Sequence, residues 1–309
     1  MQQNNFFKYI VISLKGIAMG AADVVPGVSG GTIAFISGIY EDLLTSISAI
    51  NFGLLKKIKN EGFKAAWNSV NGNFLLALFI GIFISIITLA KLISWLLVHQ
   101  PVLLWSFFFG LVLASIWFVG KQITKWNFLV VLSLTIGAFS AYYVTTLQPL
   151  ITENSSPFFI FFAGAIAICA MILPGISGAF ILVLLGAYKT VLNAIHEKDL
   201  KLLATLGVGA IVGLLTFSKL LKWLYTNYKN YTLAVLTGFI FGSLNKIWPW
   251  KIVLKSEKID DKIIVLKEES VLPYNFDGEP QLYAAILLAI IGFLVIVLLE
   301  KFANNEVNE

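Results

Sequence analysis

Long apolar runs recur along nearly the whole chain, and each is long enough to cross a bilayer as an α-helix, which needs about 20 apolar residues. The runs are continuous, whereas the strands of a membrane β-barrel alternate apolar and polar residues. Of the 309 residues 58% are hydrophobic and 13% charged, about half the charged share of a soluble domain. We therefore predict an all-α, polytopic membrane protein, a single integral membrane domain over residues 1–309. Its clearest runs are Phe74–Leu97, Val102–Val119, Phe128–Tyr143, Leu202–Leu220, Leu233–Ile247 and Leu282–Leu299.

The basic residues give no sign of nucleic-acid binding. All 22 of them are lysine, and the net charge is +5. The lysines gather in short segments between apolar runs, which is typical of cytoplasmic loops. Cys169 is the only cysteine, which excludes an internal disulfide and a multi-cysteine metal site. We expect no cofactor and no metal.

A Pro-Gly-x-Ser-Gly motif occurs twice. Val25–Gly30 reads Val-Pro-Gly-Val-Ser-Gly, and Leu173–Gly178 reads Leu-Pro-Gly-Ile-Ser-Gly. A second block of matches follows each motif at a constant offset, and it pairs Gly81 with Gly209, Lys91 with Lys219, Trp95 with Trp223, Gly110 with Gly238 and Ser115 with Ser243. Such self-similarity indicates an internal duplication. We assign the pseudo-repeats to residues 6–147 and 158–301.

Each half is predicted to hold one motif hairpin, re-entrant or broken, and three transmembrane helices. The hairpin enters and leaves the membrane on one side, whether it turns back or crosses fully. Three further crossings make an odd total, so the second half is inverted relative to the first. Inverted repeats of this kind occur in many secondary transporters. With both termini in the cytoplasm, the lysine-rich segment 51–73 lies inside, and the loop Trp250–Gln281, with five lysines and seven acids, lies outside. Lys198 and Lys201 fit this orientation least well.

The first motif predicts a broken helix with an anion-binding start. Proline and the residue before it disfavour helix continuation, and glycines permit tight turns. Ser29 and Thr32 can cap the helix that follows, which we predict from Ile33 to Ile47. Its free N–H groups and dipole suit a phosphate, and an inverted second copy would face it near the midplane. The alternative is that both motifs are packing kinks. The candidate ligand-binding residues are Asp23, Pro26, Gly27, Val28, Ser29, Gly30, Gly31, Thr32, Pro174, Gly175, Ile176, Ser177 and Gly178.

Ionisable residues within apolar runs are further candidates, because an intramembrane charge costs about 2.5–3.5 kcal/mol on insertion scales. Lys15 lies midway along such a run, and the repeat mates Lys91 and Lys219 lie three-quarters along theirs. Each could neutralise a phosphate as a point charge, or extend its ammonium group to the interface. Asp23 could carry a coupling proton or sodium ion, pair with Lys15, or cap a helix.

The string Gly20–Thr32 resembles the bacterial polyprenyl-phosphate transporter family (PopT), formerly a membrane family of unknown function. The second motif and the order of spans also match, over about Phe6 to Lys301. The resemblance implies a protein of the bacterial cytoplasmic membrane that recycles undecaprenyl phosphate, a lipid that carries glycans outward and must return. The second copy departs from the first at Ala179, where the first has Gly31. The two copies are therefore not chemically equivalent at this position.

We therefore expect a transporter, or flippase, that holds the phosphate at opposed helix N-termini and works by alternating access while the lipid tail stays in the bilayer. The main alternative is a secondary transporter of a small soluble anion. A membrane enzyme such as a lipid phosphatase would need a nucleophile or metal cluster, and the sequence shows no such motif. A channel or scaffold without a transport cycle is a third alternative. The sequence leaves open the coupling ion, the oligomeric state and the exact lipid.

Overall fold

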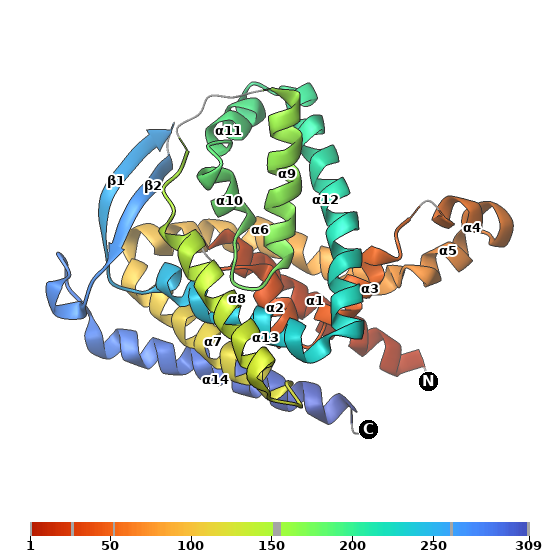
Figure 1. Cartoon of the computed structure of the whole chain (residues 1–309), viewed down its shortest axis with the longest axis horizontal. Coiled ribbons are helices and arrows are strands. Elements are labelled where there is room, and N and C mark those ends of the chain that lie inside the picture. The colour runs from red at the N-terminus through yellow and green to blue at the C-terminus, as the bar shows by residue number, and fades with distance from the viewer. Residues whose placement is uncertain (1, 26–27, 52, 151–155, 260–261, 308–309) are drawn as a thin grey trace.

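The computed structural model describes residues 2–25, 28–51, 53–150, 156–259 and 262–307. Most of the described chain is helical (Figure 1). The first half holds α1 (Gln2–Val24), α2 (Gly30–Ile36), α3 (Tyr40–Ser48), α4 (Gly53–Glu61), α5 (Phe63–Ser69), α6 (Gly72–His99), α7 (Pro101–Lys121) and α8 (Phe128–Thr146). The second half holds α9 (Pro157–Ile172), α10 (Gly178–Leu184), α11 (Tyr188–His196), α12 (Leu200–Asn227), α13 (Lys229–Ser243), the 3-10 helices η1 (Leu244–Ile247) and η2 (Pro273–Asn275), and α14 (Leu282–Val307).

Several of these helices are long and apolar enough to cross a membrane. Among the described residues four qualify, namely α6, α7, α8 and α12. A fifth span is counted if α10 and α11, which are bent by 108° at a short break, are taken together. Helix α9 and the segment Leu282–Leu298 are shorter apolar helices. The chain is therefore a multi-pass membrane protein, as its apolar runs predict.

Four helix pairs form the body of the molecule. Helix α1 lies along α6, and α9 lies along α12; α7 lies along α14, and α8 lies along α13. Glycines allow these close approaches: a Cβ on Gly81 of α6 would collide with the backbone of Ser13, and one on Gly209 of α12 with the backbone of Phe161. The last two pairs each join a helix of one half to a helix of the other, so the two halves interlock.

The all-α prediction is wrong in one segment. Within the predicted loop Trp250–Gln281, strands β1 (Lys251–Ile259) and β2 (Lys262–Ser270) form an antiparallel hairpin with a bulge near Lys255. Each strand contains a short apolar run rich in β-branched residues, Ile252–Leu254 in β1 and Ile263–Leu266 in β2, and this composition favours a strand. In Figure 1 the hairpin lies toward the edge opposite the two chain ends.

The single helix predicted from Ile33 to Ile47 is also wrong, because it is broken into α2 and α3. Gly38 adopts a left-handed φ of +75° between them, and its repeat mate Gly186 does the same, with φ of +70°, between α10 and α11. This conformation ends a helix and suits glycine. Two smaller differences concern residues 51–73, which form α4 and α5 rather than a loop, and the run Leu233–Ile247, whose α-helix ends at Ser243.

Candidate functional site

The two Pro-Gly motifs lie in direct contact. The Ser29 hydroxyl is within hydrogen-bond distance of the carbonyl oxygens of Met171 (3.0 Å) and Leu173 (3.3 Å), on the second motif's side. The Gly175 amide donates to the Thr32 hydroxyl at 2.9 Å. Segments more than 140 residues apart in sequence therefore meet at the junction of the two halves, although Pro26 and Gly27 lie outside the described residues.

The described residues of the first motif are buried within protein. Ser29 caps α2 as predicted, since it accepts the Gly31 amide at 3.1 Å, but Thr32 bonds to the other motif instead of capping. Asp23 accepts the Gly30 amide at 2.7 Å, so a carboxylate of the chain itself occupies the start of α2. Ser29 and Thr32 are each 1% exposed, and Val28 is buried beside them. In this conformation these groups do not face an open cavity.

Close packing surrounds two glycines of the first motif, against a side-chain carboxylate at Gly30 and against backbone at Gly31. A Cβ on Gly30 would lie 2.5 Å from the Asp23 carboxylate, and one on Gly31 would lie 2.6 Å from the carbonyl oxygen of Ile172. Both distances are too short for a side-chain carbon. Alanine at position 179, the repeat mate of Gly31, could not make this approach, and Ala179 is exposed. The two motif copies therefore differ in their surroundings.

The helix after the second motif is more open than α2. Pro174, Gly175, Ser177 and Gly178 are buried and Ile176 is half-buried, but the residues of α10 after Gly178 stay partly exposed up to the buried Leu184. Ser177 precedes α10, and its hydroxyl makes no hydrogen bond to any described residue. Among the described motif hydroxyls it is the one that makes no hydrogen bond at all, so both its proton and its lone pairs are left for a ligand.

Two of the lysines predicted from the sequence, Lys91 and Lys219, are not brought to the motif contact. Lys91 of α6 and Lys219 of α12 are exposed, which fits the alternative that their ammonium groups extend to the interface. Lys15 of α1 is half-buried and makes interactions of its own.

A second group of charges was missed by sequence reasoning. Lys246 of η1 and Lys251 of β1 both bond to one oxygen of Glu268 on β2, at Nζ–Oε1 distances of 2.8 and 3.1 Å. Their side chains are only 15%, 9% and 20% exposed. The three residues fall within or beside a segment interpreted as a solvated loop. The two short β-branched runs there, Ile252–Leu254 and Ile263–Leu266, are the signal that could have indicated a folded element.

Burial and mutual attraction shift the pKa values of this cluster. Burial lowers the pKa of Lys251 to about 8, although Glu268 acts against the shift. For Glu268, burial alone would raise the pKa, but Lys251 and Lys246 together hold it below its usual value. The carboxylate therefore stays ionised between two ammonium groups.

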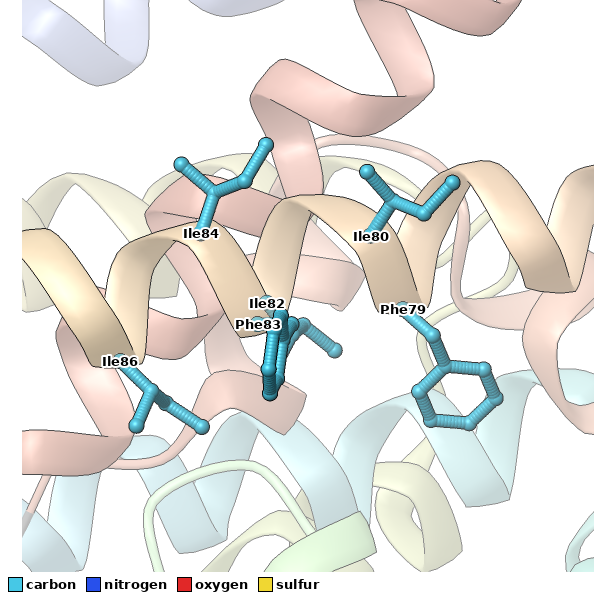
Figure 2. Close-up of a pocket in the computed structure, with 6 residues that line it drawn as sticks. All are labelled: Phe79, Ile80, Ile82, Phe83, Ile84 and Ile86. Carbon is cyan, nitrogen blue, oxygen red and sulfur yellow. The ribbon is translucent and has the colours of Figure 1, made fainter.

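An apolar hollow of about 440 Å³ lies along α6. Figure 2 shows that all its labelled side chains come from this helix. They are Phe79, Ile80, Ile82, Phe83, Ile84 and Ile86. A hollow of this composition can bind a hydrocarbon chain but offers no group to bind a phosphate. Among the described residues no three His, Cys, Asp or Glu side chains gather where they could hold a metal ion.

Apolar spans around two contacting, duplicated motifs define a multi-pass membrane protein with a polar junction inside it. The chain belongs to the undecaprenyl phosphate translocase-like family, whose family model matches residues 19–264. It is 48% identical over 303 residues to a polyprenyl-phosphate transporter of Vibrio cholerae, covering 96% of this chain and 98% of that protein. It is 34% identical over 270 residues to a polyprenyl-phosphate transporter of Staphylococcus aureus, covering 81% and 88%. No solved structure matches the chain.

Proposed function

We propose that this protein moves undecaprenyl phosphate across the bacterial cytoplasmic membrane, and so returns the lipid carrier for reuse. The observation that carries the proposal is the hydrogen-bonded contact between the two motifs at the junction of the halves. The names of two relatives aligned over most of their length support the substrate class. The reaction is transport, with no covalent step.

The helix pairing supports an inverted repeat. In the sequence register of the two halves α1 corresponds to α9, α6 to α12, α7 to α13 and α8 to α14. The pair α1–α6 then corresponds to α9–α12, and the pair α7–α14 corresponds to α13–α8. A two-fold exchange of the halves therefore preserves all four pairs. Each motif hairpin is proposed to enter and leave on its own side of the membrane.

One difference between the halves supports alternating access. Helix α3 lies against α12, whereas the corresponding helices α11 and α6 share little contact. Helix α2 is buried over most of its length, whereas α10 is buried only at Gly178 and Leu184. These differences fit a conformation closed around the first motif and open beside the second. If the first motif took the open environment and the second motif took the closed one, the protein would open toward the opposite side of the membrane.

In the proposed cycle the phosphate enters beside the second motif, where the Ser177 hydroxyl is available. Separation of the motifs would then release Ser29 and Thr32 from their present partners and let them donate to the phosphate. Charge-assisted bonds of about 1.5–3 kcal/mol each permit binding that still allows release. The tail stays in the bilayer, where apolar surfaces such as the hollow on α6 can accommodate it. A coupling proton or sodium ion would act at Asp23, by weakening its bond to Gly30.

The test is movement of undecaprenyl phosphate between leaflets of liposomes that contain the purified chain, with pH and sodium gradients varied. We expect Ser177→Ala to slow movement and to leave thermal stability unchanged. Ser133→Ala is the matched control, because Ser133 is half-buried and its hydroxyl donates only within its own helix. Equal rates in liposomes with and without the parent protein would overturn the proposal.

Two further arms address the alternatives. In the first arm, transport of inorganic phosphate is measured, together with its competition against the lipid. Transport of inorganic phosphate, and competition at a concentration similar to that of the lipid, would favour a carrier of small soluble anions. Release of phosphate from the lipid would favour an enzyme. Transport of intact undecaprenyl phosphate without either result supports the proposed function.

A further inference from the structure

We propose that Lys246 and Lys251 form an entrance site for the phosphate group of the lipid, and that the phosphate binds there by displacing the carboxylate of Glu268. The inference rests on the proposed function for the identity of the lipid. The group that binds is a phosphate monoester. The site lies on the side of the molecule that carries the β-hairpin (Figure 1).

The charges of this cluster do not balance. Two ammonium groups share one oxygen of one carboxylate, at 2.8 and 3.1 Å. All three side chains are largely withdrawn from water, where an uncompensated charge is costly. A phosphate carries up to two negative charges and three acceptor oxygens, so it can bond to both lysines at once and compensate both.

Aromatic rings hold the two ammonium groups in place. The Lys251 Nζ lies 4.4 Å from the centre of the Trp105 ring on α7, and the Lys246 Nζ lies 4.6 Å from the centre of the Phe180 ring on α10. Both distances suit a cation–π interaction. The lysines therefore keep favourable neighbours when Glu268 is displaced.

The cluster adjoins the open motif. Phe180 follows Gly178 by two residues, on the same short helix that begins after Ser177. A phosphate bound at Lys246 is therefore close to the part of α10 that stays exposed. The phosphate would bind first to the two lysines and then pass to the second motif. This gives a short polar route beside an apolar helix.

The frame of the hairpin does not depend on Glu268. The Trp248 indole donates to the carbonyl oxygen of Val271 at 2.8 Å, and the Trp250 indole donates to that of Pro280 at 2.9 Å. These bonds fix the base of the hairpin beside η1. The carboxylate can rotate away on its own flexible side chain while the strands stay paired.

The two halves are not equivalent at this site. In the register that pairs Ser115 with Ser243, the counterparts of Lys246 and Lys251 are Phe118 and Ile123. The pair of cations is thus specific to the second half. We infer that phosphate capture by this lysine pair is favoured on the hairpin side.

Binding of undecaprenyl phosphate to the purified full-length protein in lipid nanodiscs tests the site. We expect Lys246→Gln combined with Lys251→Gln to weaken binding by about tenfold or more, since two charge-assisted bonds are lost. Glu268→Gln should strengthen binding several-fold, because the competing carboxylate is gone. Lys255→Gln is the matched control, since Lys255 is exposed on the same strand, and it should bind as the parent does.

Several outcomes would overturn the inference. Parent-like binding by the double lysine variant is one, and weaker binding by Glu268→Gln is another. The Glu268 variant keeps the test decisive if the lysine variants do not fold.

Undecaprenol, which lacks phosphate, should bind equally to all variants. Competition by inorganic phosphate at concentrations similar to the lipid's would assign the site to free phosphate instead. Full transport by the lysine variants would reject this site and leave the proposed function standing, whereas no transport by the parent would reject the proposed function itself.

Discussion

The amide of Gly175 donates a hydrogen bond of 2.9 Å to the hydroxyl of Thr32, across 143 residues of sequence. The two residues belong to different copies of the same motif, and both are buried. A conformational change that separates the motifs must break this bond. It therefore marks the place where the two halves are held together in this conformation.

Removal of the acceptor should destabilise this contact. We expect Thr32→Val to leave the Gly175 amide buried without a partner, at a cost of about 1–3 kcal/mol. The melting temperature of the purified protein should fall accordingly. Thr32→Ser keeps the acceptor and should stay near the parent value. Equal melting temperatures for the valine variant and the parent would contradict the role given to this bond.

The first motif should not tolerate a methyl group at Gly31. A Cβ there would lie 2.6 Å from the carbonyl oxygen of Ile172, so Gly31→Ala must push the motifs apart. Overpacking of this kind costs about 1–3 kcal/mol. The reciprocal change Ala179→Gly, at an exposed position in α10, should cost less, at most the roughly 1 kcal/mol by which glycine disfavours a helix. Thermal unfolding of both variants measures the difference, and similar losses in the two would contradict it.

Phosphate binding should depend on pH through Lys251, which faces Lys246 from η1, Glu268 from β2 and the Trp105 ring from α7. Burial lowers its pKa from 10.5 to about 8, so its charge is lost as pH rises through about 8. Affinity for undecaprenyl phosphate should fall over that range. The second pKa of the phosphate is about 6, so its own titration ends at lower pH.

Lys251→Arg separates this effect from others, because arginine keeps its charge throughout. Its affinity should stay nearly constant where that of the parent falls. The pKa shift also has a consequence for stability. The unfolded chain binds this proton more tightly, so the free energy of unfolding should rise with pH between about 8 and the unfolded pKa. A flat binding profile in the parent would reject the role of Lys251.

The apolar pattern predicts much of the fold. The run Phe74–Leu97 lies within α6 (Gly72–His99), and Phe128–Tyr143 lies within α8 (Phe128–Thr146). Ser29 was also recognisable as a helix cap, because capping depends on a few neighbouring residues. Features of this kind are local, and the sequence is sufficient to predict them.

Other features depend on contacts that one sequence does not specify. The bond from Gly175 to Thr32 needs the relative position of the two halves. The Lys246–Glu268 pair needs the hairpin register, which brings together residues 22 apart. The break at Gly38 interrupts an apolar segment whose composition suits a continuous helix. In each case tertiary packing decides between local alternatives of similar free energy.

The most direct test of alternating access measures the exchange of undecaprenyl phosphate between the leaflets of liposomes before and after α3 is crosslinked to α12. Cysteines at Glu41 of α3 and Tyr225 of α12, two helices that lie in contact, would be joined by a short reducible crosslinker in a Cys169→Ala background. We predict fast exchange before crosslinking, exchange at the protein-free rate after it, and recovery on reduction. Exchange that is unchanged by the crosslink, or that never exceeds the protein-free rate, would contradict the account.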